Sequence, residues 1–157
     1  MATSIETIRG IYDEHKMRYY IDPEGQSLMA SYRLTDSFAA RVQIRVLEEG
    51  TFLLMTCNDL PMVDASHPMH AEVQQCLLGM NNTFRFMKFS QDASDGEIMA
   101  SGEAWLEDVE LTPRLFHRLM ANFLDCLERG QINLAAILAS TPYGAAAPTD
   151  RFKRDAA

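Results

Sequence analysis

The sequence contains one local cluster of residue types that bind metal ions. His67 and His70 are three residues apart, which places both imidazoles on one face of a helix, and Cys76 follows in the same segment. Cys76 is six residues beyond His70, however, so it lies on the opposite side of that helix. No second cluster supplies the remaining ligands of a tetrahedral site. The sequence therefore predicts no metal ion and no cofactor.

A cysteine–histidine pair is a second chemical possibility, because a thiolate with an adjacent base is a strong nucleophile. Cys57 could pair with His67 or His117, but nothing local activates the thiol and no signature motif surrounds it. The chain has three cysteines, an odd number, and they are widely spaced within apolar segments. We interpret them as reduced, buried thiols.

Three pairs of neighbouring carboxylates could exchange protons with a substrate if they were buried together. They are Asp13-Glu14, Glu48-Glu49 and Glu107-Asp108, and each lies at the end of an element or in a turn, where charge is solvated. The chain also lacks a glycine-rich phosphate loop, a Gly-x-Ser-x-Gly motif and a His-Glu-x-x-His motif. These observations predict that the protein is not an enzyme.

Length, composition and charge limit the class of protein. The chain has 157 residues, of which 47% are hydrophobic and 23% charged, so it is long enough to bury a core without disulfides. Its formal net charge of −8 repels nucleic-acid backbones and anionic lipid headgroups. No apolar run reaches the length of about 18 residues that a membrane span needs. We expect a cytoplasmic protein that binds neither nucleic acid nor membranes.

Hydrophobic periodicity predicts an α+β fold. Helical spacing indicates helices over residues 4–15, 66–82 and 113–130, with Gly130 ending the third helix, and a short fourth helix over 132–138. Alternating or continuous apolar segments indicate strands over residues 17–21, 28–33, 41–47, 52–55, 84–89 and 97–106. We therefore expect an antiparallel sheet of five or six strands flanked by helices, in the order α-β(3 or 4)-α-β(2)-α-α.

The last residues of the chain differ in composition from the rest. Pro142, Gly144, a run of alanines and Pro148 precede a basic segment, Arg151-Phe152-Lys153-Arg154. This composition predicts a single domain over residues 1–140 and a flexible C-terminal tail over 141–157. A docking peptide is the alternative interpretation of the basic segment.

The predicted order of elements is similar to the type III secretion chaperone-like fold. Several segments between about residues 4 and 138 resemble the YbjN family of proposed bacterial sensory transduction regulators. The similar segments are the Asp22-Pro23-Glu24-Gly25 turn, the strand with Val42, Ile44 and Val46, the end of the second helix over 77–82, the strand start over 84–86, and the segment 107–112 before the third helix. None of these segments is a catalytic motif.

The resemblance implies a homodimer that binds polypeptide segments; among secretion chaperones these are partly unfolded effector proteins. It places the dimer surface on the second helix and the strand that follows, at Val73, Leu77, Met80, Phe84 and Phe86. If so, Leu77→Asp should split the dimer.

We therefore expect a non-catalytic protein-binding module, chaperone-like or regulatory, whose partners are a second copy of itself and an unidentified protein or peptide segment. Two alternatives remain open. One is a small-ligand sensor or enzyme with a pocket near Cys57 and His67, and the other is a dedicated secretion chaperone for an effector protein.

Overall fold

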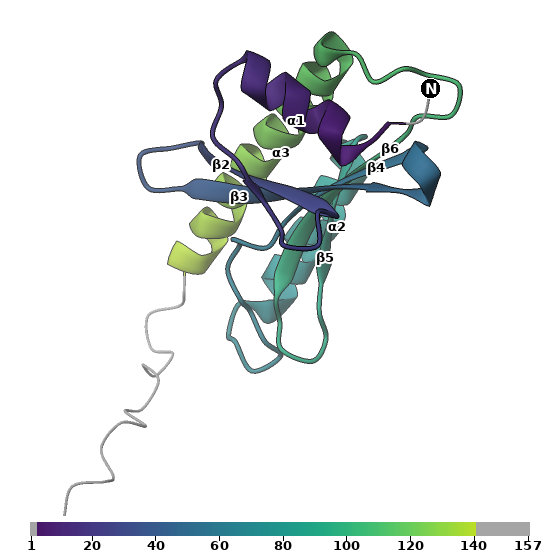
Figure 1. The fold of residues 1–157 in the computed structure, drawn as a ribbon. Coiled ribbons are helices and arrows are strands. Elements are labelled where there is room, and N and C mark those ends of the chain that lie inside the picture. The colour runs from purple at the N-terminus through teal and green to yellow at the C-terminus, as the bar shows by residue number, and fades with distance from the viewer. Residues whose placement is uncertain (1–2, 141–157) are drawn as a thin grey trace, which may run out of the picture.

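The computed structural model describes residues 3–140, which form a six-stranded antiparallel sheet and three α-helices (Figure 1). The predicted tail over 141–157 lies outside these residues. A 3-10 turn, η1 (Glu48–Gly50), joins the third strand to the fourth. The main elements are α1 (Ile5–Glu14), β1 (Tyr20–Ile21), β2 (Ser27–Arg33), β3 (Ala39–Leu47), β4 (Phe52–Cys57), α2 (His70–Thr83), β5 (Met87–Gln91), β6 (Ile98–Trp105) and α3 (Pro113–Ala139). The predicted α+β class is confirmed.

The sheet consists of two antiparallel units joined side by side. The strand order is β1-β2-β3-β4-β6-β5, in which β1 to β4 form a meander and β5 with β6 forms a hairpin. The ladder between the two units is β4 with β6, which runs from Phe52 opposite Trp105 to Cys57 opposite Ala100. β4 is therefore an interior strand, as its continuous apolar sequence predicts.

The two faces of the sheet have different environments, because successive side chains of a strand point to opposite faces. One row of directly paired residues crosses five strands and is fully buried: Leu28, Ile44, Met55, Gly102 and Met87. The helices pack on this face, which we call the covered face, and their apolar residues join the same core. The alternate row, on the face that we call the open face, contains Met29, Gln43, Thr56, Ser101 and Lys88.

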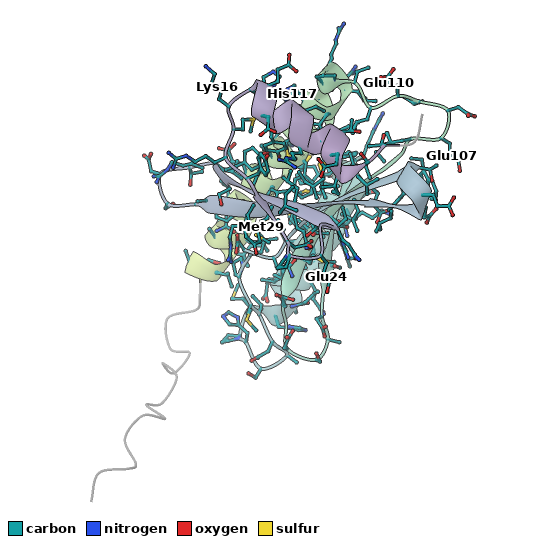
Figure 2. The ribbon with its side chains drawn as sticks, viewed as in Figure 1. Lys16, Glu24, Met29, Glu107, Glu110 and His117 are labelled. Atoms are coloured by element: carbon teal, nitrogen blue, oxygen red, sulfur yellow. The ribbon has the colours of Figure 1, made fainter. Side chains whose placement is uncertain are left out.

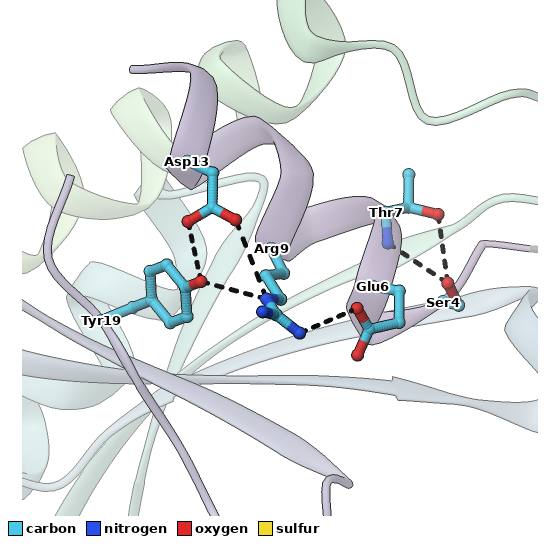
Figure 3. Close-up of polar contacts among 6 residues, drawn as sticks. All are labelled: Ser4, Glu6, Thr7, Arg9, Asp13 and Tyr19. Carbon is cyan, nitrogen blue, oxygen red and sulfur yellow. Dashed lines mark hydrogen bonds and ion pairs between the residues drawn. The ribbon is translucent and has the colours of Figure 1, made fainter. Parts of the chain in front are cut away.

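Polar side chains of α1 form hydrogen bonds and ion pairs that link this helix to Tyr19, in the segment between α1 and β1. Arg9 forms ion pairs with Glu6 (3.3 Å) and Asp13 (3.8 Å), and its Nε also donates to the hydroxyl of Tyr19 (3.2 Å) (Figure 3). That hydroxyl in turn donates to Asp13 (2.8 Å). On the inner side, the ring of Tyr12 contacts Phe116 of α3 edge-on, so α1 is fixed to both the sheet connection and α3.

Two boundaries around α2 differ from the sequence prediction. The helix begins at His70 rather than near residue 66, because a turn over residues 64–69 precedes it. It ends at Thr83, and the N–H of Phe84 still donates to the carbonyl of Met80 (2.8 Å), which makes Phe84 the C-terminal cap. The strand predicted over 84–89 therefore starts only at Met87.

The prediction that Gly130 ends a helix is wrong, and so is the predicted fourth helix. α3 is continuous from Pro113 to Ala139, and Thr112 caps its start by accepting a hydrogen bond from the N–H of Leu115. Gly130 lies where α3 packs tightly against the sheet: a Cβ atom there would be 2.3 Å from Cζ of Phe89. The glycine is needed for this contact with β5, not for a turn.

Candidate interaction surfaces

His67 and His70, at the start of α2, contact the backbone of the segment that precedes this helix. Nδ1 of His67 accepts a hydrogen bond from the N–H of Met69 (3.1 Å), and Nδ1 of His70 lies 3.4 Å from the carbonyl oxygen of Val63. Within residues 3–140, no group of three His, Cys, Asp or Glu side chains is arranged to hold a metal ion. The geometry thus gives both imidazoles a local structural role.

Cys57 is not an activated nucleophile. Its side chain is buried on β4, and this burial raises the pKa of the thiol to about 11, so the thiol stays protonated at neutral pH. Burial also raises the pKa values of Cys76 and Cys126, and all three cysteines are free thiols. Interactions that favour the thiolate, from Asp59 and Arg41 at Cys57 and from Arg129 at Cys126, are weaker than the effect of burial on each pKa.

The predicted dimer residues lie mainly inside the core of a single chain. Four of them, Val73, Leu77, Met80 and Phe84, have exposed fractions of 8% or less, and Phe86 is half-buried. In a single folded chain, these side chains offer a second copy only a small part of their surface. The dimer surface predicted on them stays a prediction, and Leu77→Asp would place a charge in the core of the single chain as well as in that surface.

The outer side of α2 carries an exposed apolar residue on an uncharged surface. Leu78 is 71% exposed. Its exposed neighbours on the helix are Gln74, Gln75, Gly79 and Asn82, and from Val73 to Thr83 the helix contains no charged side chain. We call the five residues 74, 75, 78, 79 and 82 the α2 ridge.

A groove runs along each side of the α2 ridge. The first, of about 300 Å³, lies toward the sheet edge and is lined by Gln74, Leu77, Leu78, Asn81, Phe89 and Gln91. The second, of about 330 Å³, lies toward α3 and is lined by Cys76, Gly79, Met80, Thr83, Phe84, Arg129 and Asn133. In the second groove the guanidinium of Arg129 lies 4.9 Å from the centre of the Phe84 ring. The ridge is therefore a convex strip between two depressions.

Asn81, at the base of the first groove, closes the edge of the sheet. Its side-chain amide donates to the carbonyl of Phe89 (2.8 Å) and accepts from the N–H of the same residue (2.7 Å). β5 is the outermost strand on this side, and Asn81 takes the place that a neighbouring strand would occupy. Such capping prevents uncontrolled strand pairing at an exposed edge.

A second surface lies on the open face, at the ends of β3 and β6 and the start of β4. Direct pairing places Leu47, Phe52 and Trp105 in one row, with the rings of Phe52 and Trp105 4.7 Å apart. Trp105 is 60% exposed, and Val109 in the following loop is also exposed. A hydrogen bond from the N–H of Leu106 to the carbonyl of Thr51 (2.7 Å) fixes this loop beside η1.

Acidic residues lie in the elements that adjoin this apolar row and in the loop that follows it. They are Glu48, Glu49, Glu103, Glu107, Asp108 and Glu110, and all six are exposed. Figure 2 shows Glu107 and Glu110 on the loop that leads to α3. Among residues 3–140, none of the six takes part in an ion pair. We call these residues, together with Leu47, Phe52, Trp105 and Val109, the acidic-aromatic end.

Sequence reasoning missed both Leu78 and Trp105, although each had a signal. Leu78 lies about 100° around the helix from Leu77 and thus outside the stripe formed by Val73, Leu77 and Met80. Trp105 is two residues after Glu103 on β6, so the two side chains lie on the same face of the sheet, which is the open face. In both cases the periodicity of the element indicates exposure, but it was not applied to these two residues.

Comparison with known proteins identifies a structural relative. No family model matches the sequence, and no curated protein matches it. The fold is similar to the crystal structure of YbjN from E. coli, described as "a putative transcription regulator". The superposition has a TM-score of 0.66 and covers 87% of this chain and 94% of that chain, at 14% sequence identity. The chain thus has a YbjN-like fold, which at this identity carries no assignment of function.

None of the helices in residues 3–140 has the length and hydropathy needed to cross a lipid bilayer.

Proposed function

We propose that this protein is a non-catalytic protein-binding module, regulatory or chaperone-like, that acts as a homodimer through the α2 ridge. The observation that carries the proposal is Leu78, a large apolar side chain exposed at the centre of an uncharged helix face. The centres of protein interfaces are depleted in charged residues, whereas surfaces that face only water usually contain them. The α2 ridge has the composition of such a centre.

The shape of this surface supports a second copy of the chain as the partner. In a two-fold dimer the same patch meets itself, so a surface that carries both a ridge and adjoining grooves can be self-complementary. Leu78 of one copy would enter a groove beside α2 of the other, as helix ridges pack into grooves. Gly79 leaves open space at its Cα, which allows the two helices to approach closely.

The YbjN-like fold supports a regulatory role and distant kinship with that family. The description of the E. coli protein as a transcription regulator does not require direct contact with DNA. A net charge of −8 disfavours binding to a phosphate backbone, so we propose that any regulation proceeds through protein contacts. We place the protein in the cytoplasm, where its three free cysteines would remain reduced.

The alternative of an enzyme or ligand sensor near Cys57 and His67 has less support. The thiol of Cys57 is buried and protonated, and His67 accepts a hydrogen bond from the backbone of its own turn. A dedicated secretion chaperone would use the same fold. Co-purification of one partly unfolded effector protein would distinguish this narrower role from general regulation.

The dimer is tested by Leu78→Asp with light scattering. The wild-type mass should be near twice the chain mass of 17.7 kDa, and the variant should be monomeric. Burial of one leucine contributes about 2 kcal/mol. Two copies of the substitution in a symmetric dimer should therefore weaken association by roughly a thousandfold.

Tyr20→Asp is the matched control, because Tyr20 is similarly exposed but lies on β1, at the other edge of the sheet from α2. This variant should remain dimeric. A wild-type protein that is monomeric at high micromolar concentration, or a Leu78→Asp variant that keeps the dimer mass, would contradict the proposal.

A further inference from the structure

The acidic-aromatic end has the chemistry to bind a basic segment that contains an aromatic residue. Exposed Trp105 and half-buried Phe52 form an aromatic pair, and the adjoining elements carry six exposed carboxylates without ion pairs in the described part of the chain. Aromatic rings attract both other rings and cations, with guanidinium groups favoured. Arg45, on the neighbouring row of the open face opposite Leu54, offsets only part of the acidic charge.

The chain itself contains a segment of this composition. Beyond the described residues, positions 150–154 read Asp-Arg-Phe-Lys-Arg, so one phenylalanine is flanked by three cations. The rest of the chain is acidic: removing the three cations of this segment changes the formal net charge from −8 to −11. The segment thus complements the acidic-aromatic end in both charge and aromatic content.

The geometry of α3 determines which copy can supply the segment. The acidic-aromatic end adjoins the start of α3, since Glu110 is three residues before Pro113. The described chain ends at Ser140, on the far side of the molecule (Figure 1). A helix of 27 residues is about 40 Å long. The basic segment must therefore cross about this distance to reach the acidic-aromatic end of its own chain.

Chain length makes that path unfavourable within one copy. About ten residues, 141–150, separate Ser140 from Arg151. Even fully extended, ten residues span roughly 35 Å, which is less than the length of α3. Binding to the same chain would therefore need the connection at the limit of its length, whereas binding to a second copy has no such limit.

We propose that the acidic-aromatic end of one copy binds the basic C-terminal segment, residues 150–154, of a second copy. Phe152 packs against Trp105, and Arg151, Lys153 and Arg154 lie among the carboxylates of η1 and of the loop over 106–112. This contact is separate from the α2 ridge and does not rest on the proposed dimer.

The first test uses the full-length chain with Arg151, Lys153 and Arg154 all changed to Glu, so that its own segment no longer competes. A synthetic peptide of residues 141–157 is titrated into this variant, and the emission of Trp105, the single tryptophan, reports binding directly. We expect saturable binding that weakens at least tenfold when Phe152 of the peptide is replaced by Ala. Changing Glu107, Asp108 and Glu110 of the protein to Lys should weaken it by a similar factor.

The controls separate this contact from the proposed dimer. Leu78→Asp and Tyr20→Asp, added to the same variant, should leave the peptide affinity unchanged, because neither residue belongs to the acidic-aromatic end. A lack of any emission change at millimolar peptide would overturn the proposal. So would equal binding by a peptide of the same composition in scrambled order, since charge alone would then explain the contact.

The second test asks which copy supplies the segment. A full-length Trp105→Phe chain with its native C-terminus is mixed with the charge-reversed chain, whose Trp105 is intact. Docking between copies predicts an emission shift on mixing that equals the difference between the charge-reversed and wild-type chains. If wild type and the charge-reversed chain differ but mixing has no effect, the segment binds within its own chain and the assignment to a second copy is wrong.

Discussion

The α2 ridge and the acidic-aromatic end each expose a large apolar side chain, but they differ in the charge of the residues around it. The exposed neighbours of Leu78 on its helix are amides and a glycine, whereas the elements that adjoin Trp105 carry six exposed carboxylates. A two-fold axis places a surface against its own copy, which an uncharged strip tolerates and a group of six carboxylates does not. If both proposals hold, the charge of the residues around each exposed apolar side chain indicates which kind of partner fits it.

The largest expected effect is a difference in the free energy of unfolding between substitutions at two neighbouring leucines of α2. Leu77→Asp buries a carboxylate in the core and should lower the free energy of unfolding by about 4 kcal/mol. Leu78→Asp should change the stability of the monomer by less than about 1 kcal/mol, because Leu78 is solvent-exposed in a single chain. Urea denaturation of both variants, at a concentration where each is monomeric, measures the difference. Similar losses in the two variants would mean that Leu78 is not a surface residue.

An intermediate effect is expected at the sheet edge beneath the α2 ridge. Asn81→Ala removes both hydrogen bonds to the backbone of Phe89 and should cost about 2 kcal/mol. Asn82→Ala is the matched control, since Asn82 is exposed on the adjacent position of the same helix and should change stability little. Thermal or urea unfolding measures the stability of both variants. Because the edge of β5 also loses its cap, the first variant should aggregate more readily than the second.

The smallest effect concerns salt, which should act on the two surfaces differently. Raising the ionic strength from about 0.05 M to 0.5 M shortens the range of charge interactions severalfold. It should weaken binding of the 141–157 peptide by about tenfold and leave the dimer mass unchanged, because the α2 ridge is uncharged. Dissociation of the dimer at high salt would show that ion pairs contribute to its interface.

Local patterns were sufficient to predict most elements of the fold. Helical spacing of apolar residues located α1 and the start of α3, where Thr112 and Pro113 form the expected cap and first position. Strict alternation located β3, and the continuous apolar segment after η1 located the interior strand β4. These elements are recognisable because each has one buried side whose period matches its backbone geometry.

The errors arose where a distant contact determines the local structure. Glycine often follows the last residue of a helix, so Gly130 suggested a helix end. Its actual role depends on the ring of Phe89, which belongs to another element. Phe84 and Phe86 suggested a strand, yet Phe84 caps α2 and packs near Arg129 of α3. The dimer surface predicted on the inner side of α2 stays a prediction, and the proposed α2 ridge lies on the outer side of the same helix.

The ladder between β4 and β6 has a consequence for the order in which the chain folds. Every other ladder of the sheet joins strands that follow one another in sequence, so each can close as a hairpin with little loss of chain entropy. Pairing β4 with β6 closes a loop that contains all of residues 58–97, including α2 and β5. Closing so long a loop costs more chain entropy. We therefore expect the meander and the α2-hairpin unit to form early and separately, and their joining along this ladder to be the slow step of folding.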